Sequence, residues 1–147
     1  MTTQPAGEYT RPLPDLDRKL TQPYWEGTRQ HELRIQQCDA CGHRWFPPSF
    51  CCPQCLNESY TWTKVSGRAK LWSWINMWQM YYLGFANERP YLVAFVELEE
   101  GPRLMAGLEG VAPDSADLRC DIPLEVVFDD VTPEVTLPRF RPVQGAE

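Results

Sequence analysis

The chain lacks a long hydrophobic run. No apolar stretch in its 147 residues approaches the roughly 20 residues that a membrane-spanning helix needs. Its opening stretch, MTTQPAGEYTRPLPDLDRKL, also lacks the apolar centre of a signal peptide. We therefore expect a cytoplasmic protein with no membrane partner, in which the cysteines are reduced or metal-bound rather than bridged.

Basic residues are also scarce. The sequence has 14 Lys and Arg against 20 Asp and Glu, which gives a formal net charge of −6. The longest run of cationic residues is Arg18-Lys19. Because nucleic-acid binding depends on clustered Lys and Arg, we expect no nucleic-acid partner.

Catalytic motifs are missing as well. The sequence contains no G-x-S-x-G, no H-E-x-x-H and no glycine-rich phosphate loop. Its two histidines, His31 and His43, stand in no motif. Asp129 and Asp130 are adjacent in an expected strand, so their carboxylates should point to opposite faces. We therefore predict that the chain is not an enzyme by itself.

Cysteines, in contrast, are plentiful and concentrated. Five of the six fall between Cys38 and Cys55, whereas a disulfide scaffold would spread them to close long loops. Two C-x-x-C turns stand ten residues apart, and facing turns of this kind offer four thiolates in a tetrahedron. We predict one structural Zn²⁺, although iron suits the same four-sulfur geometry. The ligands expected from the spacing are Cys38, Cys41, Cys52 and Cys55.

The second turn offers three cysteines for two positions. Cys52 and Cys55 repeat the spacing of the first turn, whereas Cys51 would form C-x-x-x-C with Cys55. We therefore predict that Cys51 points away from the metal. Gly42 is expected where the first turn needs an unusual backbone conformation, and Cys120 is expected to be a small hydrophobe at the start of a strand.

The rest of the chain is predicted to be mainly β. A five-stranded OB-fold barrel suits the number and spacing of the strand-like segments, which are 71–82, 91–100, 103–110, 122–131 and 136–143. Segment 71–82 is the least regular, because Ser73, Asn76 and Gln79 recur at three-residue spacing. The expected organisation is a flexible arm (1–22), an N-terminal helix and lead-in strand (23–37), a rubredoxin-like zinc ribbon (38–62), the OB-fold (63–143) and a tail (144–147).

Aromatic residues cluster in the first barrel strand. A small barrel cannot bury all of the aromatic side chains between Trp72 and Phe85, and an exposed group would mark an interface or a ligand groove. Core packing is the ordinary role of any one of them. The candidates for binding a partner or an acyl-CoA are Tyr24, Trp25, Trp78, Tyr81, Tyr82 and Phe85.

Taken in order, several segments resemble a known family. They are PYWEG, ELRIQQCDACG, an FPP crossing, CPQC, SGRAKLWSW, RPYLVAFVELEEGPRLMAGLEG, IPLEVVFDD and PRFRPV. Over residues 22 to 143 the chain resembles the zinc-ribbon/OB-fold family of acyl-CoA-associated proteins, long filed as domain of unknown function family thirty-five. The resemblance implies the same four zinc ligands, and three positions depart from the family: Cys51 replaces a common Arg, while Leu56 and Cys120-Asp121 stand where Gly is common.

Members of this family typically serve as non-catalytic partners of thiolase-superfamily enzymes. Such partners include acetoacetyl-CoA thiolase assemblies and thiolase-like aldolases that cleave steroid side chains. The resemblance implies an accessory subunit in a hetero-oligomer, with a steroid or other bulky acyl-CoA as the narrower expectation. Two alternatives stay open, namely an acyl-CoA carrier that holds the acyl chain against Trp78 and Tyr82, and a single-strand nucleic-acid binder, which the charge disfavours.

Overall fold

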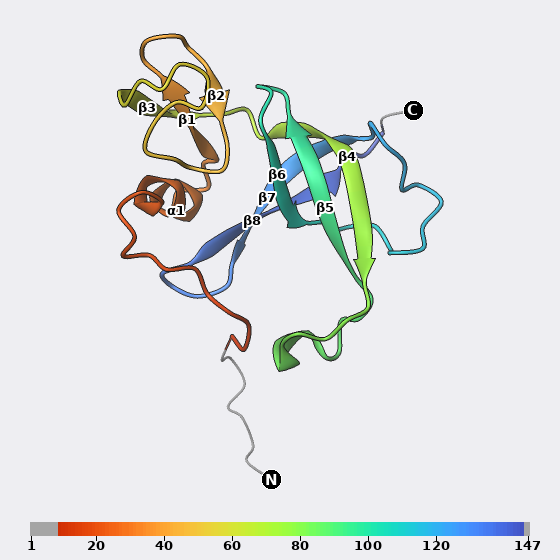
Figure 1. The fold of residues 1–147 in the computed structure, drawn as a ribbon. Coiled ribbons are helices and arrows are strands. Elements are labelled where there is room, and N and C mark those ends of the chain that lie inside the picture. The colour runs from red at the N-terminus through yellow and green to blue at the C-terminus, as the bar shows by residue number, and fades with distance from the viewer. Residues whose placement is uncertain (1–8, 146–147) are drawn as a thin grey trace.

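The structure is a computed structural model that describes residues 9–145. A helix and a small three-stranded sheet lie together at one end, and a five-stranded barrel follows (Figure 1). The elements of the first part are α1 (Gln22–Arg29), β1 (Arg34–Cys38), β2 (Arg44–Trp45) and β3 (Tyr60–Lys64). The barrel contains β4 (Arg68–Met77), the short 3₁₀ helix η1 (Leu83–Phe85), β5 (Tyr91–Leu98), β6 (Arg103–Gly107), β7 (Pro123–Asp130) and β8 (Thr136–Pro142).

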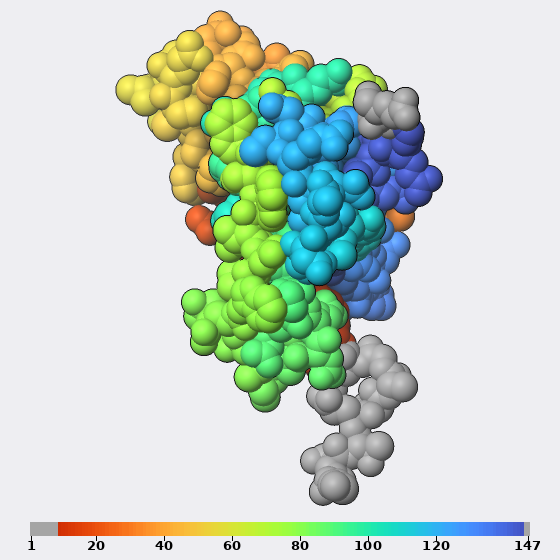
Figure 2. All heavy atoms as spheres, turned by 90° about the vertical axis from the view of Figure 1, so that its right-hand side faces the viewer, coloured from red at the N-terminus to blue at the C-terminus, as the bar shows by residue number. Residues whose placement is uncertain are grey.

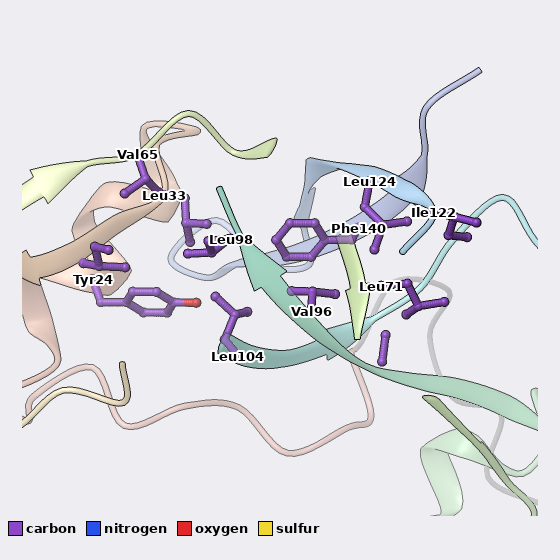
Figure 3. Packing of buried hydrophobic residues seen from close by; sticks show 12 residues of the cluster. Tyr24, Leu33, Val65, Leu71, Val96, Leu98, Leu104, Ile122, Leu124 and Phe140 are labelled. Atoms are coloured by element: carbon purple, nitrogen blue, oxygen red, sulfur yellow. The ribbon is translucent and has the colours of Figure 1, made fainter. Parts of the chain in front are cut away.

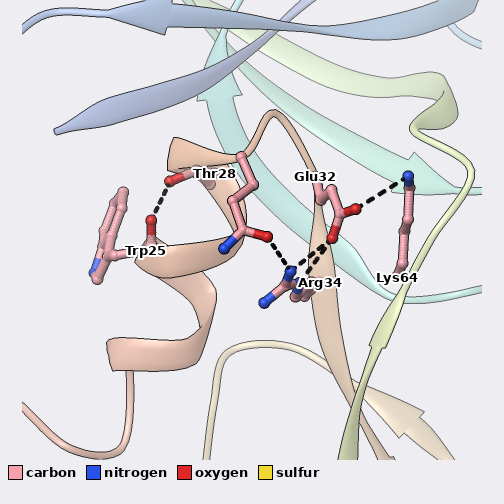
Figure 4. Close-up of polar contacts among 6 residues, drawn as sticks. Trp25, Thr28, Glu32, Arg34 and Lys64 are labelled. Carbon is pink, nitrogen blue, oxygen red and sulfur yellow. Dashed lines mark hydrogen bonds and ion pairs between the residues drawn. The ribbon is translucent and has the colours of Figure 1, made fainter.

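Helix α1 begins where the sequence places Pro23 in a first helical turn. Its buried side turns Tyr24 and Thr28 inward, and the Thr28 hydroxyl donates to the carbonyl of Trp25 at 3.0 Å (Figure 4). After the helix, Glu32 accepts hydrogen bonds from Arg34 and Lys64, which ties the start of β1 to the end of β3 (Figure 4). Arg34 also donates to Gln30 Oε1 at 2.8 Å, which connects the end of the helix to the start of the small sheet.

The small sheet is antiparallel, with the order β2-β1-β3. The lead-in strand expected before the ribbon is β1, the central strand of this sheet, and it ends at the metal-site residue Cys38. Gln36 pairs with Trp45 on one side and with Trp62 on the other. The sheet therefore carries the first cysteine turn directly.

The larger sheet closes into a barrel with the order β6-β5-β4-β7-β8. A parallel bridge between Leu108 and Phe140 joins its two edges, which is the strand arrangement of an OB-fold. Strand β5 alternates half-buried and buried residues along its whole length, as a strand with one face on a core should. Phe140, fully buried, lies in the middle of the hydrophobic cluster (Figure 3). The predicted fold class is confirmed.

The expected strand at 71–82 is wrong at both ends, because β4 runs from Arg68 to Met77. Its pairing with β5 stops at Tyr91, and the preceding Pro90 has no N–H to continue the ladder. A register shift between Leu71 and Ser73 marks a β-bulge. The bulge lies before Ser73, and the pairing with β5 is regular from Ser73 to Met77. Ser73 and Asn76 therefore point to opposite faces, while Gln79 lies beyond the strand.

One further expectation fails, and one contact was not foreseen. Cys120 is exposed in the turn before β7, where its thiol donates to the carbonyl of Trp72 at 3.4 Å, so it is not a packed hydrophobe at a strand start. His31 has a distant partner, because its Nε2 lies 3.0 Å from Asp130 Oδ1 and its ring stacks on Phe128. This contact joins the end of α1 to β7.

The terminal segments fall partly outside the described residues. Of the expected arm, residues 9–21 are described, and Leu20 is buried in the core. Of the expected tail, 146 and 147 lie outside the described range. Within residues 9–145, no helix has both the length and the apolar character required to cross a membrane.

Candidate functional site

The two cysteine turns have the same backbone geometry. The N–H of Gly42 donates to the Cys38 carbonyl at 3.0 Å, and the N–H of Leu56 donates to the Cys52 carbonyl at 2.9 Å. Both residues after the turns have a positive φ, 75° for Gly42 and 62° for Leu56. The expectation for Gly42 is therefore confirmed, and Leu56 adopts the same left-handed conformation at a steric cost.

The two turns bring four sulfur atoms together. Cys38 Sγ lies 3.5 Å from Cys55 Sγ, and Cys41 Sγ lies 3.7 Å from Cys52 Sγ. All four atoms lie within 4.8 Å of one another. A tetrahedral Zn²⁺ with Zn–S bonds of about 2.3 Å places its sulfurs about 3.8 Å apart, so the cluster fits the ion. Among residues 9–145 this is the one cluster of metal-ligand side chains, and it contains Cys52 rather than Cys51.

The pKa values of Cys38 and Cys55 depend on the neighbouring thiols and on nearby backbone N–H groups. The pKa of Cys38 is lowered to about 7, chiefly because the backbone N–H of Cys41 donates to its sulfur. The N–H of Asn57 likewise favours the thiolate of Cys55, but the neighbouring sulfurs of Cys38 and Cys41 outweigh it and raise the Cys55 pKa to about 12. Four neighbouring thiolates repel one another, and a bound dication removes that repulsion.

The site has the composition of a structural metal centre. Cys38 and Cys52 are buried, whereas Cys41 and Cys55 lie at the surface. Trp45 packs beside them, edge-on to Tyr60 with ring centroids 5.8 Å apart. Four sulfur ligands complete the coordination of Zn²⁺ and leave no position for a reacting water.

Gln36 positions the second turn. It is fully buried, its Nε2 donates to the Ser49 carbonyl at 2.8 Å, and its Oε1 accepts from the Ser49 N–H at 2.8 Å. The Ser49 hydroxyl in turn donates to the Cys51 carbonyl at 2.6 Å. Sequence reasoning missed this clamp, because a glutamine within a strand carries no local signal of its partner.

The six aromatic candidates separate into two groups. Trp78, Tyr81 and Tyr82 are 68%, 72% and 55% exposed. They lie with Leu83, which is 82% exposed, in the segment Trp78–Leu83, which we call the aromatic loop. This segment, in green, protrudes at one end of the molecule (Figure 2). Met80 in the same loop is also exposed.

The other three candidates are less exposed. Tyr24 packs in the core against Trp25 and Phe46, with ring centroids 4.9 and 5.5 Å away, and burial raises its pKa. Phe85 is half-buried and stacks on Tyr91. Tyr24, Trp25 and Phe85 border a cleft on the side of the barrel.

Comparison with known families gives two adjoining matches. The description "ChsH2, rubredoxin-like zinc ribbon domain" matches residues 25–61, and "ChsH2, C-terminal OB-fold domain" matches residues 62–129. Together they cover the ribbon with its four-cysteine zinc site and most of the barrel.

Curated relatives include both short and long proteins. A probable enoyl-CoA hydratase alpha subunit of Thermomonospora curvata is 37% identical over 99% of this chain, which spans only 44% of that relative. A DUF35 domain-containing scaffold protein of Methanothermobacter thermautotrophicus is 31% identical over 72% of this chain and 78% of its own length. The benzoylsuccinyl-CoA thiolase subunit BbsA of Thauera aromatica is 34% identical over 67% of this chain and 65% of its own length.

One solved structure is similar over nearly the whole described chain. It is titled Ltp2-ChsH2(DUF35) aldolase, and it superposes with a TM-score of 0.78 at 35% identity. The match covers 90% of this chain and 98% of that one.

Proposed function

Because the chain belongs to the DUF35 family and has the zinc-ribbon and OB-fold domains of ChsH2, we propose that it is a non-catalytic accessory subunit of a thiolase-superfamily enzyme acting on acyl-CoA. The names of its relatives support this proposal, since they include a scaffold protein, a thiolase subunit and an aldolase complex. In the resulting hetero-oligomer the chain would stabilise the enzyme and line part of its acyl-CoA site.

The aromatic loop is the observation that carries the proposal. Soluble monomers seldom expose several large apolar side chains on one protruding segment, and interfaces are enriched in Trp, Tyr and Met. Trp78, Tyr81 and Leu83 are each more than two-thirds exposed. We propose that this loop enters an apolar surface of the partner enzyme.

The non-catalytic part of the proposal is supported by the metal centre. Its four sulfur ligands leave no open position, so a bound Zn²⁺ holds the ribbon together and activates neither water nor substrate. The chemistry would therefore belong to the partner.

A narrower proposal concerns the substrate and the compartment. The partner would cleave the side chain of a steroid-like acyl-CoA, which is supported by the name of the aldolase complex and by that of a pregnadiene-carboxyl-CoA hydratase subunit, 29% identical to this chain.

A cytoplasmic location is supported by six cysteines that form no disulfide among the described residues.

The test is co-purification with the proteins encoded beside this chain, followed by co-expression with any thiolase-like enzyme found among them. Size-exclusion chromatography with light scattering should show a complex of fixed stoichiometry, and the isolated chain should show no turnover of the acyl-CoA. Changing Tyr81 and Leu83 together to Ser should weaken the complex by at least about tenfold, because buried aromatic anchors at interfaces contribute about 2 kcal/mol or more.

Phe50→Ser is the matched control. Phe50 is as exposed as Tyr81 but lies on the ribbon, so its loss should leave the complex unchanged. If Phe50→Ser dissociates the complex and the loop variant does not, the interface lies on the ribbon. Turnover of acyl-CoA by the isolated chain at an enzyme-like rate would refute the accessory role.

A further inference from the structure

A cleft of about 960 Å³ lies on the outer face of the barrel. Its floor includes Val93 on β5 and Gly107 on β6, which pair across the two strands. Because Leu92 and Ala94 point into the core, Val93 points outward into the cleft. In OB-folds, the face of the second and third strands and the adjoining loops form the usual ligand site, and here those strands are β5 and β6.

The walls of the cleft combine apolar and aromatic side chains with a polar surface of similar extent. Helix α1 contributes Trp25, the β4–β5 loop contributes Phe85, and β8 contributes Leu137. Tyr91 and Met105 add further apolar surface. A volume near 1,000 Å³ with such a lining is typical of sites that hold one small organic molecule.

The charges in the cleft select against anions. Its two cations, Arg11 and Arg139, already have acidic partners. Arg11 pairs with Glu88, while Arg139 lies 2.9 Å from Asp129 and 3.2 Å from Glu109. Three carboxylates therefore face two neutralised arginines. A phosphate or carboxylate entering the cleft would find no unpaired cation there and would face repulsion, whereas a neutral molecule would not.

One edge of the cleft is closed by a segment from the N-terminal part of the chain. We call residues 9–11 the strap; it passes beside the loop that contains η1 (Figure 1). Arg11 Nε donates to the Gly84 carbonyl at 3.3 Å, and the guanidinium lies 4.3 Å from the centroid of the Phe85 ring. At Gly84, an added Cβ would come within 2.8 Å of the backbone of Thr10. Glycine thus permits this close approach, and Arg11 fastens the strap.

From this geometry we infer that the cleft binds a neutral, largely apolar small molecule and that the strap gates its entry. The ligand lies between Val93 and Trp25, shielded by the strap. Release of Arg11 from Gly84 and Glu88 opens the edge of the cleft. The inference does not depend on a partner enzyme, because binding is measured on the full-length, zinc-loaded chain alone.

The first experiment compares two fluorescent probes with the same ring system. N-phenyl-1-naphthylamine is neutral, and 1-anilinonaphthalene-8-sulfonate carries a sulfonate. The neutral probe should bind saturably at one site, about tenfold or more tightly than the sulfonate, because the cleft lacks a free cation. Equal affinities, or no saturable binding of the neutral probe, would overturn the inference.

Variants locate the site and test the strap. Val93→Trp fills the cleft and should weaken binding of the neutral probe about tenfold, whereas Val143→Trp, at an exposed position after β8 that does not line the cleft, should not. Arg11→Ala should speed both association and dissociation about threefold, as expected for the loss of one cation–π contact, whereas Arg18→Ala should change neither rate. Zinc content and thermal midpoint confirm that each variant is folded.

Each comparison has a contrary outcome. Equal losses in the two tryptophan variants would place the probe outside the cleft. Equal rates in the two arginine variants would mean that the strap is not a gate. Gly84→Ala supplies a second test of the strap, since it should reproduce the faster rates without removing a charge.

Discussion

The ribbon and the barrel are stabilised in different ways. The apolar cluster around the cysteines has three buried residues, Cys38, Trp45 and Cys52, and two of them are metal-site cysteines. The cluster that fills the barrel has twelve buried residues and extends under α1 and β1. A segment with so small a core cannot offset its conformational entropy without the metal, whereas the barrel can rely on hydrophobic burial. Changes in one region should therefore be separable from changes in the other.

The largest effect should follow from Cys52→Ser. It removes a fully buried metal-site sulfur, and structural zinc contributes about 10–16 kcal/mol of apparent binding energy in small zinc domains. We expect zinc to fall from one ion per chain to nearly none by elemental analysis. In hydrogen exchange, β1 to β3 should lose protection while β5 keeps it.

Cys51→Ser is the matched control and should retain one zinc per chain. Cys51 is adjacent in sequence but does not belong to the four-sulfur cluster. If Cys51→Ser loses zinc and Cys52→Ser keeps it, the second turn is shifted by one residue.

The next effect in size should follow from Phe140→Ala in the barrel. Phe140 is fully buried, and truncating such a ring costs about 3–5 kcal/mol. Urea denaturation followed by tryptophan fluorescence should show that loss, while the folded protein keeps its zinc. Phe50→Ala, on an exposed ribbon residue, should change the unfolding free energy by less than about 0.5 kcal/mol. Coincident zinc release and barrel unfolding in every variant would mean that the two regions form one cooperative unit.

What the sequence predicts well is local. The C-x-x-C spacing identifies the four metal-site cysteines, because each turn is built within a few residues. The alternation in Tyr91–Leu98 identifies a strand with one buried face for the same reason. Both features follow from short-range geometry.

What it predicts poorly depends on distant partners. The bulge at Trp72 and the end of β4 at Met77 are set by pairing with β5, which lies beyond the β4–β5 loop. The contact between His31 and Asp130 spans 99 residues. The division of the aromatic candidates also follows from tertiary packing, since Tyr24 is buried beneath the ribbon while Tyr81 points to solvent. Composition alone describes these residues as equivalent.

A smaller effect should follow from Gln36→Leu, at the base of the ribbon. The substitution leaves the N–H and C=O of Ser49 without their buried partner, which costs about 1–3 kcal/mol per group. The second cysteine turn should become looser, so a chelator should remove zinc faster. Gln37→Leu, on the adjacent and less buried residue, should leave the rate near that of the wild type. An unchanged rate in both variants would show that the metal alone fixes the Ser49 segment.

The smallest effect should follow from Leu56→Gly, and it should be stabilising. Leu56 and Gly42 occupy equivalent positions after the two turns, both with positive φ, but only glycine adopts that conformation without a steric cost of about 1–2 kcal/mol. Part of the gain is offset by the greater freedom of glycine in the unfolded chain, so we expect a net gain below about 1 kcal/mol and slower zinc loss to a chelator. Gly42→Ala should destabilise the protein. The added Cβ would meet no neighbour, so only the backbone cost of the positive φ remains. Since the exposed Leu56 side chain contributes little burial to the isolated chain, a loss of stability in Leu56→Gly would mean that the two turns are not equivalent.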